Sequence, residues 1–337
     1  MSTLKNTLRD NRWACWLALA CLVVPMFASY FFDDMFSSLS ELFKNPECLE
    51  LGWDMADYGF YSSGYSFLCI WGGLIVCGAL LDRFGVRLVG SIFVGMMVLG
   101  AGLVTFAISA GFAPETSLTV AYVGCMLFGL GSEIAGVSVT RSIAKWFKGR
   151  NMALAMGLQL AIARFGTATA ILIAPMIVTQ KAAGEVYTLA DTNKPALIGL
   201  AVIALGVILW AVFVAMDAKF DRQTGETDKV ETAEEDKFRI SDIWKVLSNP
   251  RFLMIAVLCV TFYCCVIRFK KFGVSILLPL FGVNLDIATV LLAMIPFFTI
   301  LFTPLFGALV DKVGKATTWM IVGSGMVLLS HLIITFA

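Results

Sequence analysis

The chain has 337 residues, of which 59% are hydrophobic and only 15% are charged, and its mean hydropathy is +0.86. This composition excludes a soluble globular domain and indicates a protein that crosses a membrane several times. The formal net charge of +1 points to no particular partner, and we expect the protein not to bind nucleic acid.

Nine apolar runs are long enough to cross a bilayer as helices. We expect them at roughly 13–33, 58–81, 88–110, 118–144, 152–178, 195–216, 252–281, 286–310 and 317–337. No Ala-x-Ala cleavage pattern follows the first run, so we expect it to remain as a helix. Lysines and arginines concentrate in alternate loops, which predicts a cytoplasmic N-terminus by the positive-inside rule. The sequence therefore predicts an all-α polytopic membrane protein with about nine spans.

The longest polar segment, 217–250, divides these spans. It is mixed in charge and poor in apolar residues, which is typical of a linker. We therefore expect a six-helix bundle over 1–216, a cytoplasmic linker over 217–250 and a partial bundle of three helices over 251–337. Because a bundle of three helices is short of six, we expect the chain to be a fragment.

An eight-residue pattern supports this division, because it occurs once in each bundle. The first copy begins at Gly78 and contains Asp82 and Gly85, and the second begins at Gly307 and contains Asp311. Identical offsets predict two related halves in parallel orientation. We expect the charged and glycine positions of both copies to act in gating: Gly78, Asp82, Arg83, Gly85, Arg87, Gly307, Asp311 and Lys312.

An acid and a base lie within the fourth and fifth runs. At a rise of about 1.5 Å per residue, Glu133 and Arg164 lie about 20 Å from the turn that joins the two runs, and so at matching depth. A charge near the membrane centre is costly and almost always faces a partner or a water-filled cavity. We predict a polar site inside the bundle; the alternative is a structural ion pair that joins two helices.

Two basic residues of the seventh run, Arg268 and Lys271, lie three apart and share a helical face. They predict a vestibule that attracts substrate carboxylates. The alternative is that their side chains reach the outer headgroups.

Other polar positions are weighed in the same way. Tyr58, Tyr61 and Tyr65 form a stripe at helical spacing, of which only Tyr65 lies deep enough for a ligand contact. Arg141 is expected to face water or headgroups beside the turn. Asp33 and Asp34 are expected to be solvated at the outer edge, with an outer gate as the alternative.

Catalytic and metal-binding patterns are missing from the sequence. There is one histidine, and most of the nine cysteines lie in apolar runs without the spacing of metal ligands. We therefore expect no enzyme activity, no cofactor, no metal and no disulfide framework.

The Gly-x-Leu-x-Asp-Arg/Lys-x-Gly-x-Arg/Lys pattern that begins at Gly78, of which the first eight positions recur from Gly307, resembles the signature loop of the major facilitator superfamily. Five shorter runs resemble the lysosomal dipeptide transporter group of that superfamily and its bacterial relatives. They are Ser29-Tyr30-Phe31, Phe128-Gly-Leu-Gly-Ser-Glu133, Trp146-Phe-Lys-Gly149, Gly157-Leu-Gln159-Leu160 and Ala163-Arg164.

This resemblance implies alternating access around a central cavity. It implies that Glu133 meets the amino group of a peptide and Arg164 its carboxylate, with Gln159, Tyr65 and Tyr30 nearby. The residues agree, since one carboxylate and one guanidinium are complementary to a zwitterion.

Two departures from the superfamily bear on coupling. Cys125 stands where many members carry an arginine, and Pro175 lacks the glycine pattern of an antiporter motif. Both favour uniport, with proton-linked transport as the alternative.

The same residues are compatible with two other functions. One is an organic-anion carrier that uses Arg164, Arg268 and Lys271 while Glu133 only pairs with Arg164. Another is a transporter-like receptor or scaffold that signals through the linker. The chain has no Asn-x-Ser/Thr sequon, which favours a bacterial inner membrane over a lysosomal one. The expected partners are a small-molecule substrate and membrane lipid. The sequence does not decide between a monomer, a homodimer and a complex with an accessory membrane subunit.

Overall fold

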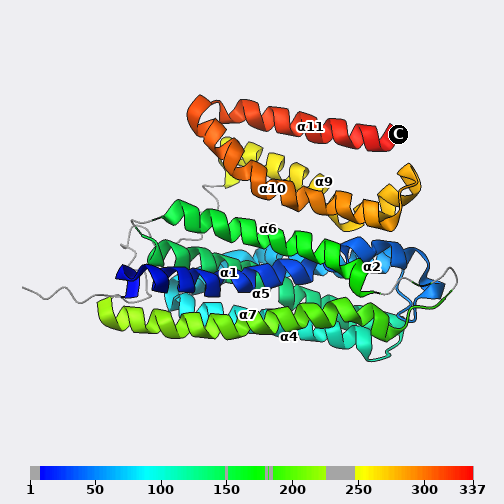
Figure 1. Ribbon diagram of the computed structural model, residues 1–337, viewed down its shortest axis with the longest axis horizontal. Helices are drawn as coiled ribbons and strands as arrows, with labels where there is room; N and C mark the ends of the chain where they lie inside the picture. Colours follow the sequence, from blue (N-terminus) through cyan, green and yellow to red (C-terminus); the bar gives the residue numbers. More distant parts are fainter. Residues whose placement is uncertain (1–7, 149–150, 179–180, 182–184, 225–246, 337) are drawn as a thin grey trace, which may run out of the picture. The chain divides into compact units, whose positions relative to one another are not determined.

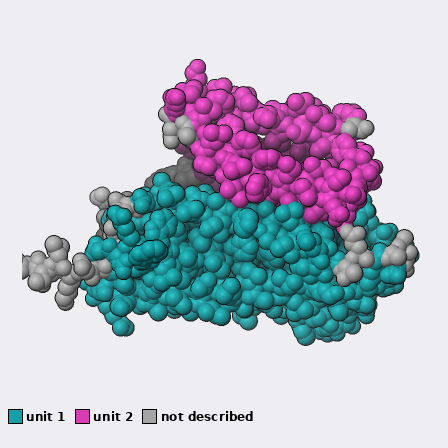
Figure 2. Space-filling model, in the orientation of Figure 1, with its two compact units in different colours: residues 1–230 teal, residues 231–337 magenta. Residues whose placement is uncertain are grey.

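The structure is a computed structural model that describes residues 8–148, 151–178, 181, 185–224 and 247–336. These residues are almost entirely helical, and their only β contact is an isolated bridge between Leu49 and Tyr187. Nine segments of the described chain are long and apolar enough to cross a membrane, which confirms the expected all-α polytopic class. The chain divides into two compact units, residues 1–230 and 231–337 (Figure 2).

Unit 1 consists of seven α-helices and several short turns of helix. The α-helices are α1 (Arg12–Asp34), α2 (Met55–Leu68), α3 (Leu74–Phe84), α4 (Val86–Ser109), α5 (Pro114–Trp146), α6 (Met152–Ile177) and α7 (Leu189–Thr224). The short turns are η1 (Leu8–Asp10), η2 (Ser37–Lys44), η3 (Pro46–Cys48) and η4 (Cys69–Gly73). Within this unit α1, α4, α5, α6 and α7 run alongside one another (Figure 1).

The described part of unit 2 contains three helices that also run side by side (Figure 1): α9 (Pro250–Phe281), α10 (Leu285–Val313) and α11 (Ala316–Phe336). Asn249 begins α9 by accepting a hydrogen bond from the backbone N–H of Arg251 at 3.1 Å, as an N-cap side chain does.

The sixth span is longer than the sequence predicted. Helix α7 continues to Thr224, so Asp217 and Asp221 lie on it and not in the linker. Both are buried, and Phe220 between them packs on the ring of Trp146 at 5.2 Å. Packing against α5 therefore extends the helix through a polar sequence. Residues 225–246 of the expected linker lie outside the described residues.

The second span is not one continuous helix. Two α-helices meet at the π-turn η4, where Gly72 has φ of 93°. Glycine adopts this backbone conformation at little cost, whereas other residues do not. The break lies about two turns after Tyr65, in the middle of the span.

Small residues set the distance between helices α4 and α5. A Cβ on Gly100 would lie 2.3 Å from the backbone nitrogen of Phe128, and one on Gly131 would lie 2.6 Å from that of Met97. Helices in a membrane associate through such close packing, because lipid removes the hydrophobic driving force. Glycine is therefore required where these two helices touch.

The repeated pattern folds alike in both units. Gly85 separates α3 from α4 with φ of 82°, and Gly314, at the same offset, separates α10 from α11 with φ of 70°. The shared turn supports the prediction of two related halves.

Candidate functional site

A cavity of about 320 Å³ lies within unit 1. Its volume is at the lower end of the range of about 300–1,000 Å³ that small-molecule sites occupy. Helices α1, α2, α5 and α6 supply its lining. The polar side chains in the lining are Tyr30, Tyr65, Ser132, Glu133, Thr140, Arg141 and Gln159.

Glu133 is held by the tyrosine of the neighbouring helix α2. The hydroxyl of Tyr65 donates to Oε1 of Glu133 at 2.9 Å and lies 3.3 Å from Oγ of Ser132. A Cβ on Gly129 would lie only 2.0 Å from the carbonyl oxygen of Tyr65. The glycine one turn before Glu133 thus lets α2 approach closely enough for this hydrogen bond.

Gln159 connects the other side of the cavity. It is 5% exposed, and its Nε2 donates to Oγ1 of Thr140 at 3.0 Å, which ties α6 to α5. The amide therefore has a fixed position in the wall.

Arg164 does not belong to the cavity lining, but it contacts Tyr30, which does. Its guanidinium is 5.7 Å from the centroid of the Tyr30 ring, a cation–π contact between α6 and α1. Gly166 brings these helices together, since a Cβ there would lie 2.5 Å from the carbonyl oxygen of Phe27. Tyr30 is within electrostatic range of both Arg164 and Glu133.

Glu133 and Arg164 are not paired with each other. Among the described residues, no ion pair joins them, and neither has another partner of opposite charge. The alternative expectation, an ion pair that only joins two helices, is therefore not what this conformation contains. Two opposite charges remain available to a ligand.

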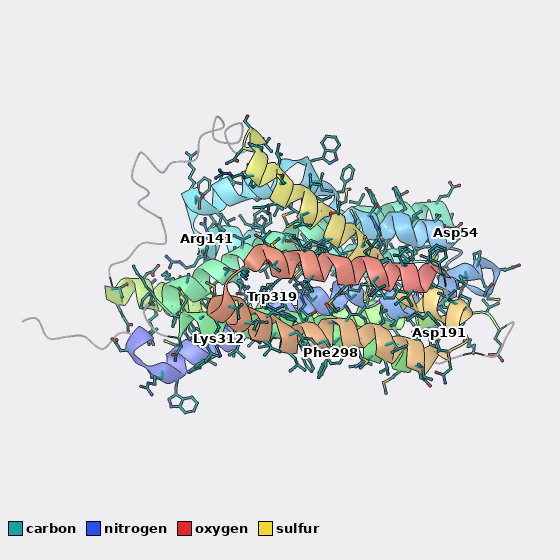
Figure 3. All side chains as sticks on the ribbon, turned by 90° about the horizontal axis from the view of Figure 1, so that it is seen from above. Asp54, Arg141, Asp191, Phe298, Lys312 and Trp319 are labelled. Carbon is teal, nitrogen blue, oxygen red and sulfur yellow. The ribbon has the colours of Figure 1, made fainter. Side chains whose placement is uncertain are left out.

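Asp82 pairs with Arg141 of α5. The sequence assigned no partner to Asp82 within the chain, and it predicted that Arg141 faces water or headgroups. Arg141, labelled in Figure 3, is among the residues that line the cavity, and its side chain is 35% exposed. The sequence could have indicated this position, because Arg141 follows Glu133 by eight residues and both therefore lie on one face of α5.

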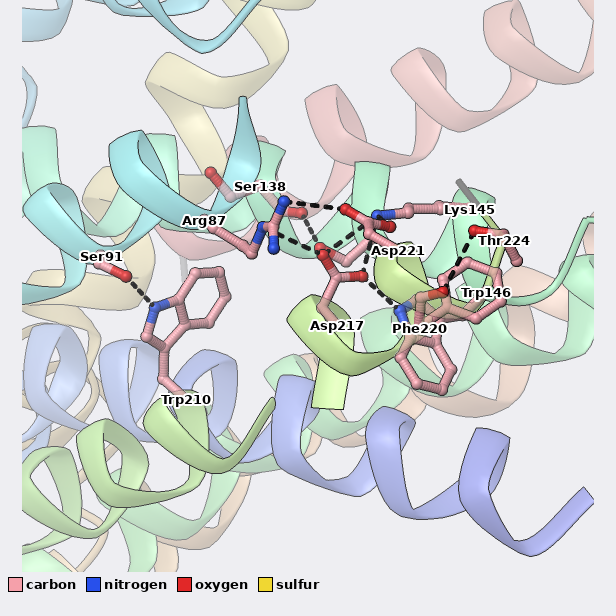
Figure 4. Close-up of polar contacts among 11 residues, drawn as sticks. Arg87, Ser91, Ser138, Lys145, Trp146, Trp210, Asp217, Phe220, Asp221 and Thr224 are labelled. Atoms are coloured by element: carbon pink, nitrogen blue, oxygen red, sulfur yellow. Dashed lines mark hydrogen bonds and ion pairs between the residues drawn. The ribbon is translucent and has the colours of Figure 1, made fainter. Parts of the chain in front are cut away.

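Arg87 belongs to a charge cluster with Lys145, Asp217 and Asp221 (Figure 4). Nη2 of Arg87 lies 2.9 Å from Asp221, and Nζ of Lys145 lies 3.0 Å from Asp217 and 2.7 Å from Asp221. Trp146 also donates its indole N–H to Asp217 at 2.8 Å. The cluster joins α4, α5 and α7. The sequence did not reveal it, because both aspartates were assigned to the linker.

The remaining gating candidates are spread over both units. Arg83 is exposed and lies 5.3 Å from the ring of Phe84, and Lys312 is exposed on α10. A Cβ on Gly78 would meet nothing within 4 Å. The side chains at positions 307 and 311 lie outside those that the structure describes, so the gating roles of Gly307 and Asp311 stay predictions.

Arg268 and Lys271 lie on α9 in unit 2. Arg268 is exposed, whereas Lys271 is 6% exposed, although their spacing suggested one shared environment. Their role in substrate binding stays a prediction.

Asp34 is buried, contrary to the expectation of a solvated side chain. Oγ1 of Thr167 on α6 donates to its Oδ2 at 2.8 Å, and Ser37 lies 3.4 Å from its Oδ1. The carboxylate therefore holds the end of α1 to α6. The sequence did not indicate this burial, because Asp34 lies at a helix end among other polar residues.

No group of three or more His, Cys, Asp or Glu side chains among the described residues is arranged to hold a metal ion.

Several known proteins resemble the chain in sequence. Relatives named "Lysosomal dipeptide transporter MFSD1" from Pongo abelii and Homo sapiens are each 28% identical over 330 residues, which is 95% of this chain and 66% of each relative. The relative of that name from Danio rerio is 28% identical over 321 residues, 92% of this chain and 64% of the relative. The chain thus spans just under two thirds of the length of these relatives.

Solved structures share the fold. A D-xylose–proton symporter superposes with a TM-score of 0.54 at 15% identity, over 88% of this chain and 68% of the symporter. A peptide transporter POT in complex with alafosfalin superposes with a TM-score of 0.50 at 18% identity, over the same shares. At these identities the likeness concerns the fold alone.

The sequence profile of the Major Facilitator Superfamily matches residues 12–337, which is nearly the whole chain. Together with its nine described segments able to cross a membrane and its repeated loop, this match shows that the chain belongs to the major facilitator superfamily of membrane transporters.

Proposed function

We propose that the protein is a secondary transporter of dipeptides or similar small zwitterions, which it moves by alternating access. The observation that supports this most is a pair of opposite charges, Glu133 in the cavity lining and Arg164 against Tyr30 of that lining, each without an oppositely charged partner in the described chain. A charge within a membrane is costly unless something pairs with it. A ligand with one ammonium and one carboxylate group would satisfy both residues.

The contacts suggest how such a ligand is held. Tyr65 binds Oε1 of Glu133, which leaves Oε2 to accept from the ammonium group. The fork of Arg164 would take the carboxylate with two parallel hydrogen bonds, turning from the Tyr30 ring. Gln159 offers an amide to the peptide bond from the cavity wall.

A thermal-shift panel on the purified protein tests this proposal, with dipeptides, free amino acids, dicarboxylates and sugars as ligands. A ligand at 100 times its Kd stabilises the folded state by about 2.7 kcal/mol. We expect dipeptides to raise the melting temperature of the wild type and to have no effect on Glu133→Gln. A dipeptide effect that persists in Glu133→Gln would contradict the proposed site.

A second candidate is an organic-anion carrier. It is favoured by a second arginine in the lining, Arg141, and by a relative named "Probable anion transporter 3, chloroplastic" from Arabidopsis thaliana, 27% identical over 142 residues, 40% of this chain and 25% of the relative. Stabilisation by dicarboxylates that survives in Glu133→Gln would support this candidate instead.

The proposal also covers whether transport is coupled to protons and which membrane contains the protein. Cys125 is buried in α5 where many members carry an arginine, which supports uniport over proton-linked transport. The predicted membrane is a bacterial inner membrane with the N-terminus in the cytoplasm, whereas the names of the relatives support the lysosomal alternative.

A further inference from the structure

One glycine of α5 lines the cavity but does not pack against the backbone of another helix. At Gly124, Gly129 and Gly131, a Cβ would come within 2.0–2.8 Å of a main-chain atom of a neighbouring helix. A Cβ on Gly136 would instead meet only the Cε and Sδ atoms of Met26 among the described residues, at 3.4 and 3.7 Å. These are ordinary van der Waals distances, so helix packing does not require a glycine at position 136.

The place of Gly136 in the cavity supplies another reason for a glycine. Inside a helix, glycine is less favourable than alanine, because it loses more backbone entropy on folding. Gly136 lies one turn after Glu133 and one turn before Thr140, which binds Gln159, and all of these residues line the cavity. The missing side chain therefore leaves space between the carboxylate and the amide of the lining.

Apolar side chains complete the lining around these polar groups. They belong to Met26 of α1, Val137 of α5 and Leu160 of α6. Met26, which faces Gly136, is 8% exposed and packs in the hydrophobic core of the unit. Methionine is flexible and polarizable, so it adapts to apolar groups of different shape. The space at Gly136 therefore suits an apolar group of a ligand.

We propose that Gly136 and Met26 form the subsite for the side chain of the substrate's amino-terminal residue, and that Gly136 allows this side chain to be large and apolar. The inference rests on the proposed function, in which Glu133 binds the ammonium group. The first side chain is attached to the carbon that carries this ammonium group, so it lies close to Glu133. The second side chain lies beyond the peptide bond, and Gly136 does not limit its size.

Isothermal titration on the full purified chain tests the inference with three dipeptides, Ala-Ala, Leu-Ala and Ala-Leu. Gly136→Ala adds one methyl group to the proposed subsite. It should weaken the binding of Leu-Ala by about 10-fold, the lower end of the range for one methylene group in an apolar pocket. It should change the affinity for Ala-Ala and Ala-Leu by no more than about twofold, since neither has a large first side chain.

Met26→Ala supplies the complementary change. It removes Sδ and Cε, the atoms nearest to the methyl group that Gly136→Ala adds. Combining the two substitutions should therefore restore most of the affinity for Leu-Ala. A purely structural effect of Gly136→Ala would not be reversed by the loss of a second, buried side chain.

Gly157→Ala is the matched control, because Gly157 lies on α6 outside the cavity lining and a Cβ there would meet nothing within 4 Å. It should change no affinity by more than about twofold. Melting temperatures of the unliganded variants separate packing from binding. Gly136→Ala should not lower the melting temperature, since alanine favours the helix. A clear drop would show that Gly136 is needed for packing and would overturn the inference.

The outcomes separate the two proposals. A wild type that binds no dipeptide contradicts the proposed function. A wild type that binds dipeptides, together with a Gly136→Ala variant that does not weaken Leu-Ala more than Ala-Leu, overturns the subsite and leaves the proposed function intact. Should Met26→Ala fail to fold, the comparison of Leu-Ala with Ala-Leu in Gly136→Ala decides.

Discussion

Two regions of unit 1 contain charges within the helical bundle, and they treat those charges in opposite ways. In the charge cluster of α4, α5 and α7, Asp217 and Asp221 lie within 2.7–3.7 Å of Arg87 and Lys145. At the cavity, Glu133 accepts one hydrogen bond from a neutral tyrosine, and Arg164 rests on an aromatic ring.

We interpret the difference as one between charges that stabilise the fold and charges to which the proposed function assigns a ligand. Removing one member of a buried ion pair is strongly destabilising, because the charge that remains is uncompensated. Removing a charge that has no partner costs the apo protein little and instead removes a contact for the ligand. The partners of the charges distinguish the two classes.

The largest effect is expected at the charge cluster. Asp217→Ala removes the acceptor of Lys145 and of the Trp146 indole, and should lower the free energy of unfolding by about 3–5 kcal/mol. Thermal unfolding in detergent measures it. The matched variant Glu133→Gln should change the stability of the apo protein by less than about 1 kcal/mol. Equal losses in the two variants would refute the distinction.

A smaller effect is expected where the helices touch behind the cavity. Gly129→Ala places a Cβ against the Tyr65 carbonyl and should destabilise the protein by about 1–3 kcal/mol while weakening substrate binding. Gly157→Ala is the control, because a Cβ there meets nothing within 4 Å. It should stabilise α6 by up to about 1 kcal/mol. The stabilities are measured from unfolding curves. If Gly157→Ala were less stable than Gly129→Ala, the close approach of α2 to α5 would not be needed.

The smallest effect is expected from the tyrosine that holds Glu133. Tyr65→Phe removes only a hydroxyl and should weaken dipeptide binding by about 3- to 10-fold, the equivalent of one hydrogen bond of about 1 kcal/mol. Titration with Ala-Ala measures the change. Tyr122→Phe, whose ring stacks on Phe60 at 4.3 Å, should leave the affinity unaltered. A Tyr65→Phe variant with wild-type affinity would mean that Glu133 needs no support from α2.

Much of the fold could be predicted because its signals are local. Apolar runs report membrane spans, and the repeat at Gly78 and Gly307 predicted two related halves, later matched by the positive φ of Gly85 and Gly314. The depth of Glu133 and Arg164 also follows from counting residues along a helix. Helix ends were less accurate, since packing on Trp146 extends α7 to Thr224.

By itself, the sequence determined the fold class, the family signature and a polar site at mid-depth, because each depends on residue type and spacing along one chain. Only the tertiary structure decided which charges have partners. The contacts of Asp82 with Arg141, of Arg87 with Asp221 and of Thr167 with Asp34 all join different helices. No helix specifies its neighbour through its own periodicity; that choice depends on close packing at small residues such as Gly100 and Gly129.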